Sequence, residues 1–146
     1  MESWLIYGLG AALCFGINGI INKVLTSPSY IGLSSASTAF LFLIGTAIAV
    51  GGYVFTQKTY AVPGNNLAIL LGILAGFIWA FGFILTLVAL NAEKADIARL
   101  APIYNMNTLV IVFLGILLLH ELPMSGDMLK VVAGSILIVI GGILVS

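Results

Sequence analysis

Charged side chains are the scarcest class in this sequence. Of its 146 residues, five are Lys or Arg, five are Asp or Glu and one is His, so charged residues make up 7% of the chain. A soluble domain carries about 25% charged residues, because its surface must face water. This deficit, together with 62% hydrophobic residues, excludes an ordinary water-soluble fold and predicts that lipid surrounds most of the chain. The net charge of zero leaves no basic stripe for nucleic acid.

Cysteine and histidine are equally rare, which limits the chemistry. Cys14 is the single cysteine, so neither an intramolecular disulfide nor a thiolate metal site is expected, and we interpret it as a small packing residue. His120 is the single histidine, and no pair of carboxylates lies within an apolar stretch to act with it. We therefore expect no enzyme, no metal and no cofactor.

Five apolar stretches are long enough to cross a bilayer as helices, which takes about 20 residues each. We expect a single domain over residues 1–146, an all-α bundle of five transmembrane helices in the cell membrane. Short breaks rich in turn residues separate the stretches, so successive helices should be antiparallel neighbours. The stretches are Ser3–Val24, Leu33–Phe55, Leu67–Leu90, Ile97–Leu119 and Met128–Val145.

Capping residues and small residues indicate how these helices begin and pack. The asparagine pair at 65–66 is predicted to cap the third helix, Asp96 the fourth, and Ser125 or Asp127 the fifth. Small residues four apart let helix backbones approach closely in lipid. The sequence predicts packing seams on this basis at Gly8, Ala12 and Gly16 and at Gly72 and Gly76; the alternative is that these glycines let the helices slide.

Basic residues near the helix ends give almost no orientation bias. Lys58 and Lys130 fall on one side of the predicted bundle, and Lys23, Lys94 and Arg99 fall on the other. A difference of one positive charge is a weak orienting signal. We hypothesise that the chain inserts in both orientations; a single topology set by other features is the alternative.

Polar residues inside the predicted spans are candidate binding groups, because such groups are costly in lipid and face a bundle interior. Asn18 and Asn22 lie one turn apart on the first helix and either bind a polar substrate or hold helices together. Trp79 falls near mid-membrane and either lines a cavity or packs against a helix carbonyl. Lys23 and Arg99 either draw anions at the mouths of a pathway or only extend to the headgroups.

The 97–119 helix carries the densest polar set in the chain. Pro102 lies within this set, and its missing N–H should free the Ala98 carbonyl and bend the helix. A broken, polar half-helix near a cavity is a common transporter feature; the alternative is that its first turns lie in the headgroup region. The candidate substrate contacts here are Tyr104, Asn105 and Thr108, with Asn107 beside them.

The order of features from Leu87 to Val145 forms a further pattern. Ala-Leu ends the third helix, a polar turn follows, and a proline lies in a small-residue helix before Glu121-Leu122. This pattern, with Gly134 and Gly141-Gly142 in a short last helix, resembles the EamA domain of the drug/metabolite transporter superfamily. The first helix, AALCFGINGIINKVLTS, is also similar to the opening helix of that family. Two positions depart from it: residues 37–40 lack the arginine of many relatives, and His120 replaces their glycine.

The resemblance implies a transporter. The usual relative has ten helices in two five-helix repeats of opposite orientation, and this chain resembles one repeat. We therefore expect a homodimer of antiparallel copies that moves a small polar metabolite or drug by alternating access. The resemblance suggests amino acids, nucleotide sugars or phosphorylated metabolites as substrate classes. The alternatives are a non-transporting scaffold or accessory subunit, and a lipid-carrier flippase.

Overall fold

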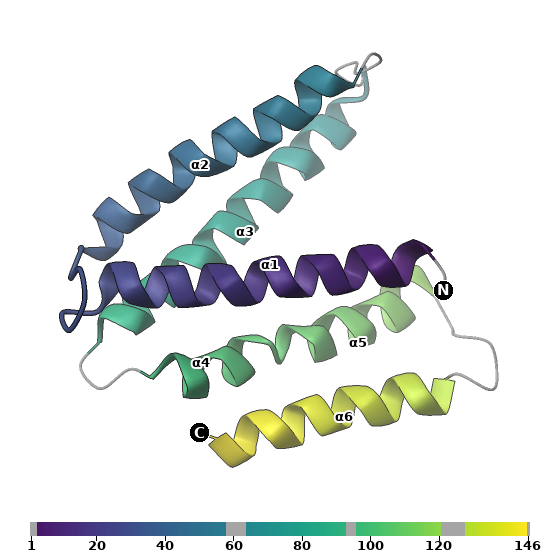
Figure 1. Ribbon diagram of the computed structural model, residues 1–146. Helices are drawn as coiled ribbons and strands as arrows, with labels where there is room; N and C mark the ends of the chain where they lie inside the picture. The colour runs from purple at the N-terminus through teal and green to yellow at the C-terminus, as the bar shows by residue number, and fades with distance from the viewer. Residues whose placement is uncertain (1–2, 58–63, 93–95, 121–127, 146) are drawn as a thin grey trace. The chain divides into compact units, whose positions relative to one another are not determined.

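The chain divides into two compact helical units. The computed structural model describes residues 3–57, 64–92, 96–120 and 128–145, and all regular structure in these ranges is α-helical (Figure 1). The first unit covers Met1–Glu93 and the second Lys94–Ser146, and each is described by itself. The first contains α1 (Ser3–Thr26), α2 (Ser35–Thr56) and α3 (Asn66–Asn91); the second contains α4 (Ile97–Tyr104), α5 (Asn107–Leu119) and α6 (Met128–Val145).

In the first unit, α2 and α3 form an antiparallel hairpin, and α1 contacts both through its C-terminal turns (Figure 1). The N-terminal part of α1, from Ile6 to Ile17, is exposed, whereas Asn22 and Thr26 are buried. Leu87 and Leu90 of α3 are the hydrophobic residues buried in the described part of this unit. Its core therefore lies where the end of α1, the start of α2 and the end of α3 meet.

The connection from α1 to α2 folds back onto the last turn of α1. The Ile31 N–H donates to the Val24 carbonyl at 3.2 Å, and the Leu33 N–H donates to the Leu25 carbonyl at 2.7 Å. These bonds satisfy carbonyls that a helix end otherwise leaves without partners. The reversal needs Gly32 at φ +71°, where a Cβ would lie 3.4 Å from the Pro28 Cα. A residue with a side chain is disfavoured in this left-handed conformation.

In the second unit, α6 packs along both α4 and α5. Gly142 allows the closest approach, because a Cβ there would lie 3.1 Å from the Met106 sulfur and 3.4 Å from the Pro102 carbonyl oxygen. Ser135, also buried on α6, donates its hydroxyl to the Val131 carbonyl at 2.9 Å. The glycine near the end of α6 thus faces the segment that joins α4 to α5.

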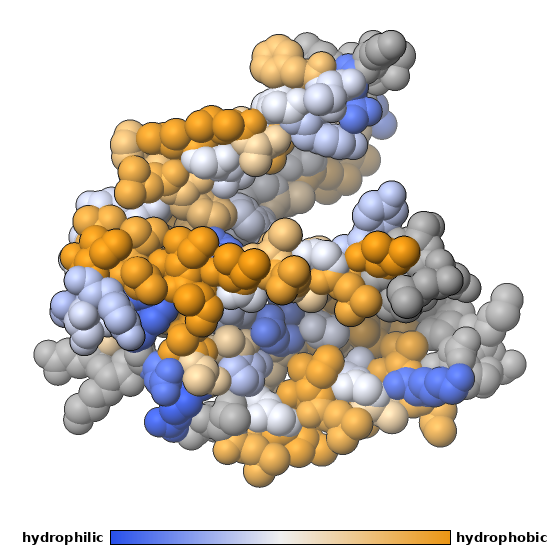
Figure 2. Space-filling view, in the orientation of Figure 1, coloured by the Kyte–Doolittle hydropathy of each residue, from blue (hydrophilic) through white to orange (hydrophobic). Residues whose placement is uncertain are grey.

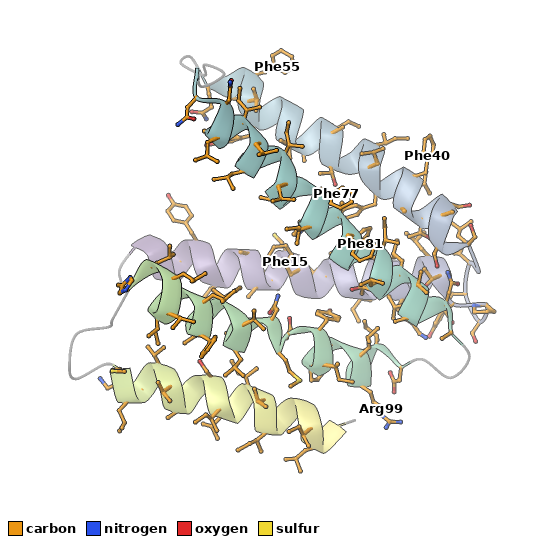
Figure 3. The ribbon with its side chains drawn as sticks, turned by 180° about the vertical axis from the view of Figure 1, so that it is seen from behind. Phe15, Phe40, Phe55, Phe77, Phe81 and Arg99 are labelled. Carbon is orange, nitrogen blue, oxygen red and sulfur yellow. The ribbon has the colours of Figure 1, made fainter. Side chains whose placement is uncertain are left out.

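Most apolar side chains of both units are exposed. Figure 2 shows hydrophobic side chains covering the visible faces of α1, α2 and α6. Phe40 and Phe55 point outward from α2 (Figure 3) and are 63% and 86% exposed. Water would oppose such exposure, whereas lipid favours it. Stretches long and apolar enough to cross a membrane are Ile6–Thr26, Ser35–Thr56, Asn66–Asn91 and Ile97–Leu119.

The helix boundaries match the sequence prediction within two residues, and two predicted caps are confirmed. The Asn65 side chain accepts from the Leu67 N–H at 2.9 Å, and the Asp96 carboxylate accepts from the Ala98 N–H at 3.0 Å. Ser34, whose capping role the sequence did not reveal, accepts from the Ser37 N–H at 3.1 Å. The predicted cap at Ser125 or Asp127 lies outside the described residues, as do Lys58 and Lys94.

Three expectations differ from the structure. The 97–119 segment is a candidate span as predicted, but it is interrupted rather than only bent, because α4 ends at Tyr104 and α5 begins at Asn107. The apolar part of α6, Met128–Leu144, is shorter than the four candidate spans. The predicted seams at Gly8, Gly16, Gly72 and Gly76 are not closed in the first unit, since no neighbouring atom among the described residues lies within 4 Å of an added Cβ.

Candidate functional site

The interruption between α4 and α5 is the most polar stretch within the candidate span Ile97–Leu119. Pro102 has no N–H, so the carbonyl of Ala98 loses its i→i+4 donor. Beyond it the backbone tightens to i→i+3 bonds: Met106 N–H to Ile103 at 3.2 Å, and Thr108 N–H to Asn105 at 3.1 Å. A stretch of this 3₁₀ type inside an otherwise α-helical span often marks a functional position.

Four neutral polar side chains surround this interruption. Asn105 and Asn107 are exposed, whereas Tyr104 and Thr108 are half-buried. Within the part of the chain that the structure describes, none of the four side chains makes a hydrogen bond. Met106, between them, has no side-chain bond that caps α5. We name these four residues the break cluster; along the chain it comprises three predicted contacts and Asn107, which the sequence singled out only as a neighbour.

Helix α6 approaches the interruption closely at Gly142. The Met106 thioether lies over Gly142, and the Pro102 carbonyl faces the same glycine. Methionine is flexible and fills irregular gaps, so this contact fits a backbone that departs from a regular helix. The sequence signal was the Gly141-Gly142 pair, which alone did not identify its partner.

On α1, the two predicted asparagines differ in burial. Asn22 is 4% exposed, and Asn18 is half-buried one turn earlier. The Asn22 carbonyl accepts from the buried Thr26 hydroxyl at 2.9 Å. Lys23 is half-buried in the last turn of α1. Arg99 is exposed and extends outward from the first turn of α4 (Figure 3).

A polar tie that the sequence did not predict joins the three helices of the first unit. The Asn91 amide, in the orientation that satisfies both of its ends, donates to the Thr26 carbonyl at 2.9 Å and accepts from the Ser35 N–H at 2.7 Å. The Ser35 hydroxyl contacts the same amide and lies 3.2 Å from the Leu87 carbonyl, to which it can donate. The sequence signal for the tie was the serine-rich start of α2. These contacts serve to assemble the unit.

Thr38 is a second buried polar group that the sequence did not single out. Its side chain is 1% exposed, and its hydroxyl has no hydrogen-bond partner among the described residues. It lies one turn after Ser34 on α2, where its own N–H donates to the Ser34 carbonyl at 3.0 Å.

Trp79 belongs to an aromatic stack between α2 and α3. Its ring centroid lies 5.6 Å from Phe42 and 6.0 Å from Phe83, and those two phenylalanines lie 3.8 Å apart. The stack lines a groove of about 320 Å³ whose other walls include Thr46 and Leu43. The indole is 50% exposed, and it donates no hydrogen bond to a described residue. Trp79 therefore lines this groove, and its partners within the described residues are aromatic rings rather than a helix carbonyl.

The predicted site residues fall into both units. Asn18, Asn22, Lys23 and Trp79 lie in the first, and the break cluster and Arg99 lie in the second. Within the first unit, Trp79 packs with α2 rings, while Asn22 lies at the helix ends near the Asn91 tie. Among the described residues no group of three or more His, Cys, Asp or Glu side chains could hold a metal ion, and Cys14 is exposed.

The helices define the class of this protein: it is all-α, with four candidate spans that indicate a multi-pass membrane protein. In comparisons with known proteins, no protein-family model, no curated protein and no solved structure matches the chain.

Proposed function

We propose that this protein transports a small polar metabolite or drug across the membrane as an antiparallel homodimer. The observation that carries the proposal is the break cluster, a set of polar side chains inside an apolar span that have no hydrogen-bond partners among the described residues. Irregular backbone at membrane depth is tolerated where it lines a cavity or is buried in protein. Discontinuous helices of this kind commonly form the substrate sites of transporters.

The EamA resemblance supports the same function. A single five-helix repeat needs a second copy to form the ten-helix arrangement, and α6 would supply the fifth span. With 18 residues, α6 measures about 27 Å, which a locally thinned bilayer accommodates. Asn18, Asn22, Trp79, Tyr104, Asn105 and Thr108 would contact the substrate, with Lys23 and Arg99 near the mouths.

Uptake into proteoliposomes tests the transport function. A screen of radiolabelled polar metabolites should find at least one that enters only vesicles containing the protein. Asn105→Leu should reduce that uptake at least about tenfold, because an amide that bonds the substrate is lost. Asn66→Ala, an exposed substitution at the start of α3, is the matched control and should leave uptake unchanged. A folded protein that transports nothing in the screen favours the scaffold alternative.

Crosslinking between two differently labelled copies tests the antiparallel dimer. In a Cys14→Ser background, Ser29→Cys and Gln57→Cys place thiols at opposite ends of α2. Antiparallel copies bring these two ends to the same membrane face, so a short bifunctional reagent should join the two variants. Products that contain only like pairs would show a parallel dimer.

A further inference from the structure

The interiors of the helices contain no strongly ionisable side chain. Asp, Glu, Lys, Arg and His are absent from residues 6–22, 35–56, 66–91, 100–119 and 131–144. The basic residues that the structure describes, Lys23, Arg99 and Lys130, all lie within a turn of a helix end. A substrate that crosses beside these helices therefore meets no fixed countercharge in their interior.

The break cluster carries no charge but is rich in hydrogen-bond donors and acceptors. Its two amides each present two donors and one acceptor oxygen, and its two hydroxyls each donate and accept. All four side chains are without hydrogen-bond partners among the described residues. Unpaired polar groups in hydrocarbon are costly, so the cluster requires a polar partner that both donates and accepts.

The free energy of desolvating the solute decides which kind of solute can bind the break cluster. Moving an ion into a site of low dielectric costs several kcal/mol even after relaxation, unless an opposite charge is present. A neutral hydroxyl or amide that finds matched hydrogen bonds avoids most of that cost. Arg99 does not supply the missing charge, because its exposed side chain extends outward at the start of α4 (Figure 3).

On this basis we propose that the break cluster selects an uncharged solute carrying several hydroxyl or amide groups and rejects anions, cations and zwitterions. This inference rests on the proposed transport function and narrows it. It sets aside phosphorylated metabolites, nucleotide sugars and free amino acids, which the family resemblance alone would allow.

Chemical access to the cluster tests the selectivity without requiring transport. In a Cys14→Ser background, Asn107→Cys is treated with three methanethiosulfonate reagents of similar size, one neutral, one anionic and one cationic. Rates are divided by those at Ser29→Cys, which lies in the exposed α1–α2 connection. The neutral reagent should modify the thiol of the Asn107→Cys variant at least about tenfold faster than either charged reagent, since each ion must be desolvated. Equal normalised rates, or faster modification by a charged reagent, would overturn the proposal.

Leu118→Cys provides the lipid-facing control for this measurement. Leu118 is 64% exposed on the last turns of α5, with the exposed Leu117 and Leu119 beside it. If this variant shows the same preference for the neutral reagent as the Asn107→Cys variant, the selectivity belongs to the bilayer and the proposal fails. A polar pathway at the break should instead give the Asn107→Cys variant the higher absolute rate with the neutral reagent.

A second experiment compares solutes directly in proteoliposomes. Osmotic swelling is followed with a hexitol, nicotinamide, glycine, glycerol phosphate and choline as separate probes. Entry of a neutral probe, reduced by Asn105→Leu, supports the proposal. Entry of a charged or zwitterionic probe alone overturns it and leaves the transport function intact. Neutral-selective labelling without entry of any probe supports the selectivity of the break and argues against transport.

Discussion

At the scale of the residue, the first unit depends on one amide. Asn91 bonds to Thr26 and Ser35, so a single side chain connects the ends of three helices. Interhelical hydrogen bonds in membrane proteins contribute about 0.6 kcal/mol on average. A side chain that satisfies several backbone groups at once should contribute more, because its loss leaves each of them unpaired.

Asn91→Ala should therefore lower the free energy of unfolding by about 1–3 kcal/mol. Thermal unfolding of the purified protein in detergent measures this change. Asn66→Ala, at the exposed opposite end of the same helix, should change the stability by less than about 0.5 kcal/mol. Equal effects of the two substitutions would mean that the tie contributes nothing.

Gly32 is the second residue whose identity the fold requires. Its φ of +71° brings the α1–α2 connection back onto α1. Gly32→Ala should lower the free energy of unfolding by about 1 kcal/mol or more, because the left-handed conformation is disfavoured once a Cβ is present. Gly52→Ala, in an open position on α2, should raise it by roughly 0.5–1 kcal/mol. The opposite signs make the pair a sensitive test in the same unfolding assay.

A positive φ also occurs at the end of α5. His120 adopts φ 56° and ψ 27°, and its N–H donates to the Gly115 carbonyl. Glycine is the usual residue in such a helix cap. This chain meets the same backbone requirement with histidine.

At the scale of the element, two features coincide at the interruption of the 97–119 segment. Pro102 removes one helix hydrogen bond, and Gly142 lets α6 approach the point where the helix is interrupted. The sequence predicted the effect of Pro102, a bent or broken helix. It did not predict the approach of α6, because that contact joins residues that lie far apart along the chain.

Gly142→Ala should destabilise the second unit. The added Cβ would lie 3.1 Å from the Met106 sulfur and 3.4 Å from the Pro102 carbonyl. Methionine can move aside but the backbone carbonyl cannot, so we expect a loss of about 1 kcal/mol. Gly134→Ala is the matched control on α6, since no neighbouring atom of the described chain lies within 4 Å of its added Cβ. If the two substitutions have the same effect in thermal unfolding, the close approach at Gly142 is not important.

At the scale of the whole molecule, the near balance of basic residues leaves the orientation open to small changes. Lys23, Arg99 and the C-terminus are expected on one face of the membrane, and Lys130 is expected on the other. Cytoplasmic loops carry the excess of Lys and Arg in membrane proteins. Adding one basic residue to either face should therefore select one orientation.

Reporter fusions at Ser146 test this prediction. In the unchanged chain, a reporter active only in the cytoplasm and one active only outside should both give signal. Ser29→Lys should raise the cytoplasmic signal at the expense of the other, and Gln57→Lys should do the reverse, because the two residues flank α2. Ser29→Gln introduces a longer side chain without adding a charge, so it should leave both signals unchanged. One active reporter in every variant would establish a single topology.

The local properties of the sequence were sufficient to determine where the long apolar segments of this protein begin and end. Apolar runs, asparagine and aspartate caps, and the scarcity of charge predicted the helix boundaries and the candidate spans, because each depends on neighbours within a few residues. Part of the candidate site was also accessible in this way, since Tyr104, Asn105 and Thr108 follow Pro102 closely.

Only the tertiary structure decided which residues of these helices contact one another. It separated the 97–119 segment into α4 and α5, assigned Asn91 to the ends of α1 and α2, and stacked Trp79 on Phe42 and Phe83. The contacts of Asn91 and Trp79 join distant segments through packing. The physical reason is that polarity and hydrophobicity specify which residues leave water, whereas helix packing specifies which of them meet.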